Sequence, residues 1–226
     1  MEERYTRNIP TIQPLEQQLL AEKKVVILGC GGIGGYLVEN LVRIGIGELT
    51  VVDGDVFQPS NLNRQSLAAA ETLGWKKVRA AEAYAEAVNP NVKVRGIPEY
   101  FNRTNADQLV ARADLVMDAL DNIPTRLLLE EVCAAHAVPV LHGAVRGWLA
   151  QIAVVPPGSG MLRRLYGESG EQTGGSTIAA VPQLCAAIQT AQAVAFLCGR
   201  QVPLWGRLLL INAEDMSWNF VDGNVL

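Results

Sequence analysis

A glycine-rich turn that links an apolar run to a helical stretch constrains this chain more than any other feature. Residues 24–28 end in four consecutive aliphatic side chains, as the buried strands of parallel sheets do. Residues 29–34 follow with the sequence Gly-Cys-Gly-Gly-Ile-Gly, which matches G-x-G-x-x-G. Glycines permit a tight turn and a close approach of backbone to phosphate, and the N-terminus of the next helix presents free N–H groups. The segment therefore predicts a nucleotide-binding turn.

Asp53 supplies a second element of nucleotide binding. It ends another apolar run, residues 48–53, about 20 residues after the glycine turn, where a carboxylate accepts hydrogen bonds from ribose hydroxyls. This order of strand, turn, helix, strand and acid is typical of nicotinamide dehydrogenases and also of enzymes that use ATP. At this point the pattern leaves both classes open.

Short apolar runs alternate with helical stretches along the rest of the chain. We expect strands at residues 92–97, 114–117, 138–141, 148–155, 207–212 and 217–221, and helices near residues 76–88 and 105–112, after Pro124 and within residues 178–198. Such alternation predicts a parallel sheet that is covered by helices on both faces and joined by right-handed crossovers. The expected fold class is α/β, with a doubly wound, Rossmann-like, mostly parallel sheet extended by C-terminal antiparallel strands.

A single domain over residues 1–226 is the simplest organisation, because the chain shows no internal repeat and no low-complexity linker. We divide it into an N-terminal arm (residues 1–23), a nucleotide-binding core (24–143) and a segment with a crossover loop, a helix and the last strands (144–226). Within the last segment, residues 159–176 are polar and rich in glycine, which predicts a mobile loop.

Charge and cysteine content exclude several classes of ligand. The formal net charge of −4 argues against a nucleic-acid-binding face, which needs clustered lysine and arginine. The four cysteines form no Cys-x-x-Cys pair, so we expect no zinc. The N-terminus lacks the apolar stretch of a signal peptide, and Pro182 and three glutamines interrupt the apolar residues 178–198. We expect a cytoplasmic protein in which that stretch forms a buried or subunit-interface helix, without a membrane or nucleic-acid partner.

A polar loop after Asp53 separates the two enzyme classes. A dehydrogenase normally proceeds quickly into its second helix, whereas here polar side chains follow beside the predicted nucleotide pocket; they are Ser60, Asn61, Asn63, Arg64 and Gln65. Arg64 and Lys77 offer cationic contacts to a triphosphate, although Lys76 competes with Lys77 for this role. The loop favours ATP.

Asp121 and Asn122 follow the strand expected at residues 114–117, at the carboxyl edge of the sheet. Ligands of doubly wound folds bind along that edge. A carboxylate opposite two cations is well placed to hold Mg²⁺. Arg126 lies four residues past Asn122 on one helical face, and either orients the Asp121 turn or occupies an ordinary surface position. For His136 and His142 we expect packing or solvent contact without a specific partner.

These motifs together resemble the ThiF/MoeB/HesA family, the bacterial relatives of ubiquitin-activating enzymes. The matching segments are residues 29–34, residues 53–65, Lys77, Asp121-Asn122 and residues 207–221, together with Arg4-Tyr5-Thr6-Arg7-Asn8, where the family usually has Arg-Tyr-x-Arg-Gln. The string Ser-Asn-Leu-Asn-Arg-Gln at residues 60–65 is the most diagnostic of them. The resemblance covers nearly the whole chain.

The resemblance implies an activity and a set of residue roles. Family members use MgATP to adenylate the C-terminal glycine carboxylate of a small ubiquitin-like sulfur-carrier protein, which here implies a partner that ends in Gly-Gly. Asp121 would bind Mg²⁺, and Arg7 would reach into the ATP site of the neighbouring subunit of a homodimer. The residues expected to bind the nucleotide are Gly29, Gly31, Gly32, Gly34, Asp53, Asp55, Ser60, Asn61, Arg64, Lys77 and Asn122. Those expected to act in catalysis are Arg7, Arg64, Lys77 and Asp121.

Two cysteine features of many relatives are missing. The family's zinc-binding Cys-x-x-Cys pairs are absent, and the crossover-loop residues 172–177 contain no cysteine that would form a thioester or persulfide-linked adduct. Cys185 has the sequence context of a buried small apolar residue. We therefore expect adenylation without a covalent thioester step.

Other functions remain open at the level of sequence. The same chemistry would activate a peptide C-terminus or a tRNA-linked carboxylate, although the acidic balance disfavours tRNA. A non-catalytic nucleotide-binding subunit is a further alternative, and the retention of Arg64, Lys77 and Asp121 argues against it. A dehydrogenase would leave the polar loop without a purpose.

Overall fold

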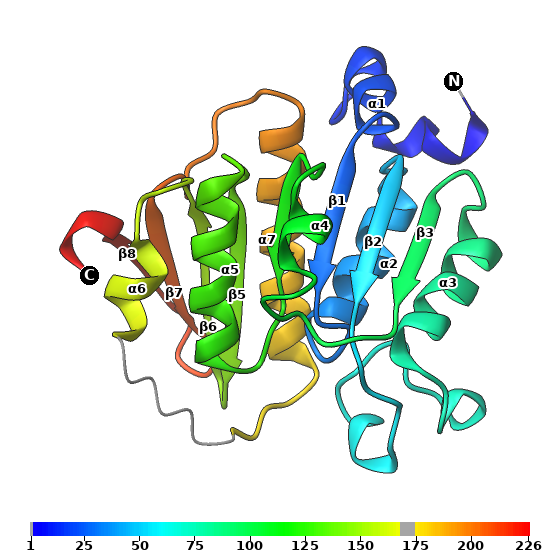
Figure 1. Cartoon of the computed structure of the whole chain (residues 1–226). Coiled ribbons are helices and arrows are strands. Elements are labelled where there is room, and N and C mark those ends of the chain that lie inside the picture. The colour runs from blue at the N-terminus through cyan, green and yellow to red at the C-terminus, as the bar shows by residue number, and fades with distance from the viewer. Residues whose placement is uncertain (1, 168–174) are drawn as a thin grey trace.

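The computed structural model describes residues 2–167 and 175–226, and an eight-stranded mixed sheet forms its centre (Figure 1). The strand order is β3-β2-β1-β4-β5-β6-β7-β8. The strands are β1 (Lys24–Leu28), β2 (Glu48–Val52), β3 (Lys93–Ile97), β4 (Leu115–Asp118), β5 (Val140–Arg146), β6 (Leu149–Val155), β7 (Arg207–Asn212) and β8 (Ser217–Asp222). Neighbours from β3 to β5 pair in parallel, and those from β5 to β8 pair antiparallel. The predicted fold class is confirmed.

Helices cover both faces of the sheet, and each layer encloses its own apolar core. One layer contains α2 (Gly34–Ile44), α3 (Lys77–Val88) and α7 (Ala180–Leu197); the other contains α4 (Ala106–Val110), α5 (Ile123–Ala135) and α6 (Met161–Tyr166). In Figure 1, α5 lies in front of the sheet and α7 behind it. Strand β1 pairs with β2 on one side and β4 on the other, so the chain order reverses there. A doubly wound fold binds its ligand at this reversal point.

Helix α7 packs against β5, β6 and α2. Among the described residues it is the one helix that is long and apolar enough, by length and composition only, to cross a membrane. Half of that helical window is buried inside the protein, including Val181, Cys185, Ala186 and Ala193, which are fully buried. In this structure α7 is a core helix of the sheet's second layer.

Helix α6 lies in a segment that we predicted to be a loop, so this part of the prediction is wrong. A distant carboxylate stabilises it, because the backbone N–H groups of Leu162 and Arg163 donate to Glu130 of α5 at 2.8 and 3.0 Å. Glu130 satisfies two of the free N–H groups at the N-terminus of the helix. Residues 168–174 of the predicted crossover loop lie outside the described part of the chain.

Strand β5 also differs from its prediction, since it continues to Arg146 instead of ending at Leu141. It forms a hairpin with β6 through Gly147, whose φ of +59° suits glycine. The partner strand supplies hydrogen bonds that the isolated segment lacks.

The N-terminal arm folds against the amino edge of the sheet, at the top of Figure 1. It contains the 3-10 helix η1 (Glu3–Asn8) and α1 (Pro14–Leu20). The buried Tyr5 hydroxyl accepts a hydrogen bond from the Asn89 side chain at 2.8 Å, and Arg200 pairs with Glu16. These contacts fix the position of the arm.

Arg164 of α6 holds the C-terminal end of the chain. Its guanidinium donates two hydrogen bonds to the Gly223 carbonyl, at 3.0 and 2.7 Å, and one to the Ser159 carbonyl at 2.7 Å. Gly223 begins the last 3-10 helix, η4 (Gly223–Val225). Charge-assisted hydrogen bonds from Arg164 thus join the Ser159 turn to the C-terminal end of the chain.

Candidate active site

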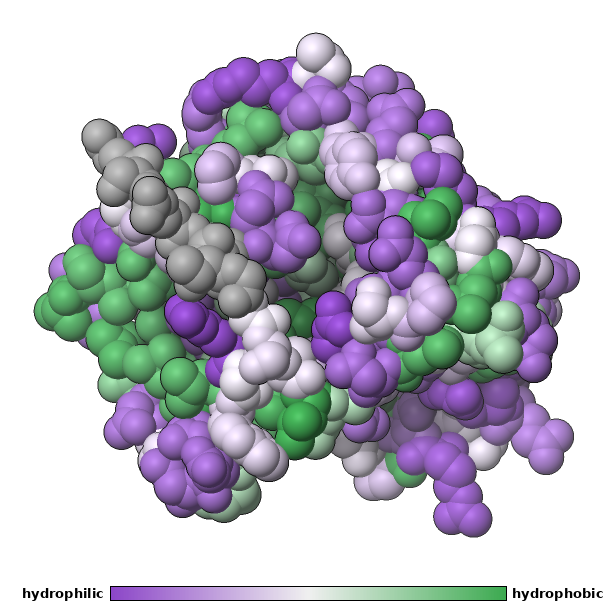
Figure 2. Space-filling view, turned by 90° about the horizontal axis from the view of Figure 1, so that it is seen from below, coloured by the Kyte–Doolittle hydropathy of each residue, from purple (hydrophilic) through white to green (hydrophobic). Residues whose placement is uncertain are grey.

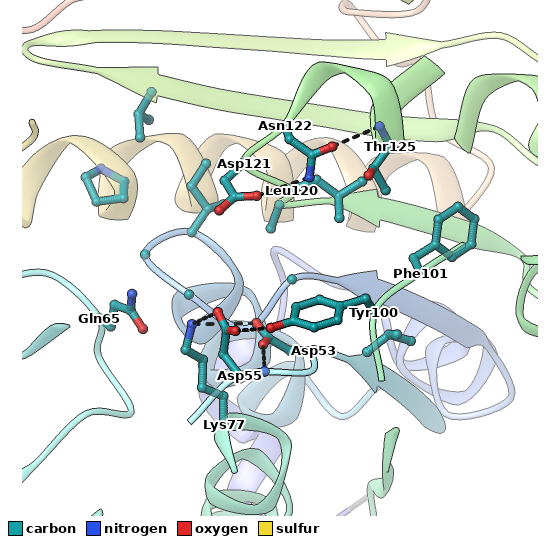
Figure 3. A pocket seen from close by; sticks show the side chains of 18 of the residues that line it. Asp53, Asp55, Gln65, Lys77, Tyr100, Phe101, Leu120, Asp121, Asn122 and Thr125 are labelled. Atoms are coloured by element: carbon teal, nitrogen blue, oxygen red, sulfur yellow. Dashed lines mark hydrogen bonds and ion pairs between the residues drawn. The ribbon is translucent and has the colours of Figure 1, made fainter. Parts of the chain in front are cut away.

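A cavity of about 420 Å³ opens at the carboxyl ends of β1 and β4, where the strand order reverses. Figure 2 looks onto this edge of the sheet and shows the hollow near the centre of that face. Figure 3 shows Asp53, Asp55 and Lys77 on one side of the cavity and Asp121 on the other. The sequence prediction that these residues share one site is consistent with this arrangement.

The glycine turn after β1 forms the floor of the cavity, to which Gly29, Gly31 and Gly32 contribute. Gly29 has a φ of +93°, and a Cβ atom there would lie 2.5 Å from the Ala119 carbonyl oxygen. A Cβ atom on Gly34 would lie 1.9 Å from the Gly29 carbonyl oxygen. Gly34 does not line the cavity but begins α2, so its glycine allows the turn to close on the helix.

Asp53 fixes the shape of the glycine turn. Its Oδ2 accepts a hydrogen bond from the Cys30 N–H at 2.7 Å, and its Oδ1 accepts from the Asp55 N–H at 2.8 Å. The carboxylate lines the cavity with only 9% of its side chain exposed. One acid therefore joins the turn after β1 to the loop after β2.

Lys77 is a buried cation at the cavity wall, with 6% of the residue exposed. Its Nζ lies 3.0 Å from Asp55 Oδ2 and 3.9 Å from Asp53 Oδ2. Lys76 donates from Nζ to the Gly54 carbonyl at 2.6 Å and does not line the cavity. Of the two lysines, Lys77 is the one whose charge reaches the site.

Tyr100 was not singled out by the sequence, yet it closes one side of the cavity beside Asp55 (Figure 3). Its hydroxyl donates to Asp55 Oδ1 at 2.5 Å. That hydrogen bond and the nearby Lys77 ammonium hold the pKa of Asp55 below its ordinary value, against the opposing effect of partial burial. The Tyr100 ring lies over Gly54, where a Cβ atom would be 2.8 Å from the ring.

The polar loop brings Arg64 and Gln65 to the cavity wall. Arg64 Nη1 donates to the Ser60 carbonyl at 3.0 Å and to Asn63 Oδ1 at 2.8 Å. Buried Gln65 has an Oε1 atom without a hydrogen-bond partner among the described residues. Ser60 and Asn61 belong to a 3-10 turn, η2 (Pro59–Asn61), and do not line the cavity, so their contact with nucleotide stays a prediction.

The facing wall is the turn between β4 and α5. Asn122 caps α5 by accepting a hydrogen bond from the Thr125 N–H at 3.0 Å. Asp121 precedes it, is exposed to the cavity, and accepts one hydrogen bond from the Asn122 side chain at 3.3 Å. Buried Arg126 donates through Nη2 to the Leu120 carbonyl. Arg126 therefore orients the Asp121 turn, which was one of its two predicted roles.

A buried polar cluster behind this turn corrects our expectation for His142. His142 has no exposed surface, and its Nδ1 lies 2.6 Å from Asp118 Oδ2. The parallel pairing of β4 with β5 places the two residues side by side. Arg126 Nε lies 3.3 Å from the same carboxylate oxygen, and the Tyr166 hydroxyl lies 3.0 Å from His142 Nε2. His136 also has a partner, Asp107 at 2.8 Å, on the surface.

Burial and charge fix the protonation of this cluster. Burial lowers the pKa of His142, against the opposing effect of the hydrogen bond that His142 Nδ1 donates to Asp118. Burial raises the pKa of Asp118, but the Arg126 charge and the His142 hydrogen bond outweigh it, so the pKa of Asp118 lies below its ordinary value. The cluster therefore consists of a carboxylate, a guanidinium and a neutral imidazole.

Cys30 in the glycine turn and Cys185 on α7 are buried thiols. Burial raises the pKa of both Cys30 and Cys185 well above the ordinary value, because a thiolate is poorly solvated there. A thiol with a raised pKa is a poor nucleophile. Within residues 2–167 and 175–226, no group of three or more histidine, cysteine, aspartate or glutamate side chains could hold a metal ion.

A second cavity, of about 580 Å³, adjoins the first on the face of β5 to β8. Arg126, Val145 and Gly175 line both cavities. Its outer part is apolar, with Leu149 54% exposed and Leu210 37% exposed. Figure 2 shows apolar surface gathered on the side of the molecule that carries β6 to β8 in Figure 1.

Arg7 lies far from this site in its own protomer. It occupies the last turn of η1, at the amino edge of the sheet, whereas the cavity opens at the carboxyl edge (Figure 1). Its side chain makes no hydrogen bond or ion pair with the residues that the structure describes.

A doubly wound sheet with a glycine turn, an acid after β2 and cations at its carboxyl edge defines a nucleotide-binding α/β protein. The chain belongs to the ThiF family, whose model matches residues 5–224. This confirms the family resemblance and its extent over nearly the whole chain.

Two curated relatives illustrate the family. The chain is 34% identical over 229 residues to the SAMP-activating enzyme E1 of Haloferax volcanii, covering 97% of this chain and 84% of that protein. It is 31% identical over 230 residues to the sulfur carrier protein adenylyltransferase of Thermus thermophilus, covering 96% of this chain and 85% of the relative. Among solved structures, Escherichia coli MccB with ATP superposes with a TM-score of 0.84 at 23% identity, covering 98% of this chain and 72% of that one, and so shows the same fold.

Proposed function

We propose that this protein adenylates the C-terminal glycine carboxylate of a small ubiquitin-like sulfur-carrier protein, with ATP as the second substrate and pyrophosphate as the product. The observation that carries the proposal is a pair of adjoining cavities that share three lining residues. One presents the glycine turn, Arg64 and Lys77 to an anion, and the other leads into it from an open sheet face. The relatives named as a SAMP-activating enzyme and as a sulfur carrier protein adenylyltransferase support this proposal.

The chemistry requires positioning and charge stabilisation instead of a general base. A C-terminal carboxylate has a pKa of about 3.5 and is ionised at neutral pH. Its oxygen attacks the α-phosphorus of ATP, a new carboxyl O–P bond forms, and the bond from the α-phosphorus to the bridging oxygen breaks as pyrophosphate leaves. Arg64, Lys77 and the N–H groups of the glycine turn stabilise the negative charge that develops.

Asp121 is the residue that would hold Mg²⁺. Its carboxylate faces the cavity and has a single hydrogen-bond partner from a neutral amide, so its oxygens are free to bind a cation. Mg²⁺ in nucleotide sites is commonly held by one or two carboxylates together with phosphates and water, and one such carboxylate fits this pattern. When bound, the ion neutralises charge on the phosphates.

The second cavity suits the approach of a carrier tail. A tail that lies along the face of β6 and β7 passes Leu149 and Leu210 and then reaches the residues shared by the two cavities. Its carboxylate would enter beside Arg126 and Val145. The exposed leucines would contact the body or tail of the carrier.

A homodimer would complete the site. Arg7 cannot reach the cavity of its own protomer, because the two lie at opposite edges of the sheet. Trp218 and Phe220 of β8 lie on the same face of the sheet as α7, and they are 46% and 52% exposed. They pair with Ile211 and Leu209 of β7. A second copy that covers these side chains would bring its Arg7 toward this protomer's cavity, as the ThiF/MoeB/HesA resemblance implies.

ATP–pyrophosphate exchange tests the activity. We expect exchange of radiolabelled pyrophosphate into ATP only when a carrier ending in Gly-Gly is present, and none with a carrier truncated by its last glycine. If no Gly-Gly carrier supports exchange while NAD⁺ raises the melting temperature more than ATP does, the proposal is wrong.

A further inference from the structure

Gln151 of β6 stands between the buried polar cluster and the second cavity. It lines that cavity, and its residue is partly exposed. Its Nε2 lies 3.2 Å from His142 Nε2 and also donates to the Tyr166 hydroxyl. Its Oε1 makes no hydrogen bond with any residue that the structure describes. One end of this amide is therefore occupied inside the protein and the other is free.

The direction in which this amide points follows from the charges behind it. Asp118 accepts a hydrogen bond from the Leu120 N–H at 2.9 Å and lies 3.3 Å from the Arg126 guanidinium, so it is a carboxylate. A carboxylate only accepts hydrogen bonds, so the proton of neutral His142 lies on Nδ1. His142 Nε2 is then an acceptor and needs a donor.

Two donors face that nitrogen, the Tyr166 hydroxyl and the Gln151 amide N–H. If the Gln151 side chain were turned over, its oxygen would face the lone pair of His142 Nε2 and leave this acceptor with one donor fewer. The buried cluster therefore determines which end of the Gln151 amide faces the cavity. The exposed end is the oxygen.

We propose that Gln151 Oε1 accepts a hydrogen bond from a backbone N–H in the extended C-terminal tail of the carrier, and that His142 is a positioning residue that sets the direction of this amide. The inference rests on the function proposed above. A Gly-Gly tail has no side chains, so its backbone N–H groups are the donors by which a protein recognises it. Gln151 lies opposite Leu210 in the β6–β7 pairing, which places the acceptor beside the apolar entrance.

Steady-state exchange assays with the full chain test the role of Gln151. We expect Gln151→Leu to raise the KM for the carrier about tenfold, the upper range for one lost hydrogen bond, while the KM for ATP stays within about twofold. Gln192→Leu is the matched control, because Gln192 is a partly exposed glutamine that accepts one hydrogen bond, from the Leu204 N–H, and lines neither cavity. Melting temperatures show whether both variants fold.

His142 is tested with a pair of variants. His142→Leu removes the acceptor that orients Gln151, so we expect the KM for the carrier to rise about threefold with the KM for ATP unchanged. His142→Gln can donate to Asp118 and accept from Gln151, and we expect it to restore most of the lost carrier affinity. A merely structural role for His142 would change both KM values or neither.

Carriers with a single N-methylated peptide bond identify the hydrogen bond itself. With the wild type, N-methylation at one position among the last few residues should raise the KM, and with Gln151→Leu the same modification should add nothing. The inference alone would be overturned if N-methylation raised the carrier KM equally in both proteins at every position. It would also be overturned if Gln151→Leu raised the carrier KM no more than Gln192→Leu does. Absence of carrier-dependent exchange in the wild type would overturn the proposed function as well.

Discussion

The two halves of the sheet differ in the kinds of residue that line their cavities. The parallel half, β3 to β5, ends in loops whose polar and glycine residues converge on one cavity. The antiparallel half, β6 to β8, has few charged side chains in its cavity and offers an open, largely apolar face. A small charged ligand is recognised by residues at fixed spacing, whereas a protein partner is recognised by area and shape. The two halves meet at Arg126, Val145 and Gly175.

The largest expected effect concerns a residue that belongs to neither half. Arg7→Ala should lower kcat for carrier-dependent exchange about 1,000-fold, as loss of an arginine supplied in trans does in other phosphoryl-transfer enzymes. Mixing Arg7→Ala with Asp121→Ala should restore about a quarter of the wild-type activity, because half of the dimers are mixed and each has one complete site. If the mixture stays inactive while subunits exchange, Arg7 does not act across a dimer.

A second prediction tests the parallel half alone. Asp121→Ala should lower kcat about 100-fold or more without loss of the fold, because Asp121 is exposed and has a single hydrogen bond to lose. Exchange activity and the melting temperature are the two measurements. Asn122→Ala is the informative companion, since it removes the cap of α5 and should lower the melting temperature. Full activity of Asp121→Ala would assign the magnesium role to another group.

The antiparallel half is tested by its exposed leucines. Leu149→Ser with Leu210→Ser should raise the KM for the carrier about tenfold and leave the KM for ATP unchanged, since contact with a partner would bury both side chains. Val225→Ser serves as control because Val225 is 75% exposed and lines neither cavity. If the double variant raises the carrier KM no more than Val225→Ser does, this face is not part of the proposed docking surface.

The smallest expected effect concerns the end of the antiparallel half. Arg164→Met should lower the free energy of unfolding by about 1 kcal/mol, because three hydrogen bonds to backbone carbonyls are lost from a partly exposed site. Denaturant unfolding measures the change, with Arg112→Met as an exposed arginine control. Equal stability of the two variants would show that Arg164 does not secure the C-terminus.

The comparison of the two halves also explains what could be predicted from the sequence. The glycine turn, Asp53 and Lys77 were recognisable because each follows or begins a regular element, so their place at one edge follows from chain order. His142 and Asp118 were not paired in advance, since their contact depends on the register of two strands that are 24 residues apart in the chain. Tyr100 was missed for the same reason.

Helix α6 shows a further limit. Two of its N–H groups donate to Glu130, which lies on α5 about 30 residues earlier. The sequence of residues 161–166 does not indicate this contact. The apolar cavity of β6 to β8 carries no motif at all, because its residues are ordinary for strands. Site residues that belong to a motif with fixed local spacing could be predicted from the sequence. Contacts between segments far apart in the chain could not.

The pairing of Lys77 with two carboxylates has a consequence for turnover. The Lys77 ammonium lies 3.0 Å from Asp55 and 3.9 Å from Asp53, so a phosphate that binds this ammonium must compete with the two carboxylates. A ligand with one weak charge competes poorly with these carboxylates for Lys77, whereas a triphosphate competes well. After pyrophosphate leaves, Lys77 can form its ion pair with Asp55 again. The same carboxylate would thus select the incoming nucleotide and help to empty the site for the next cycle.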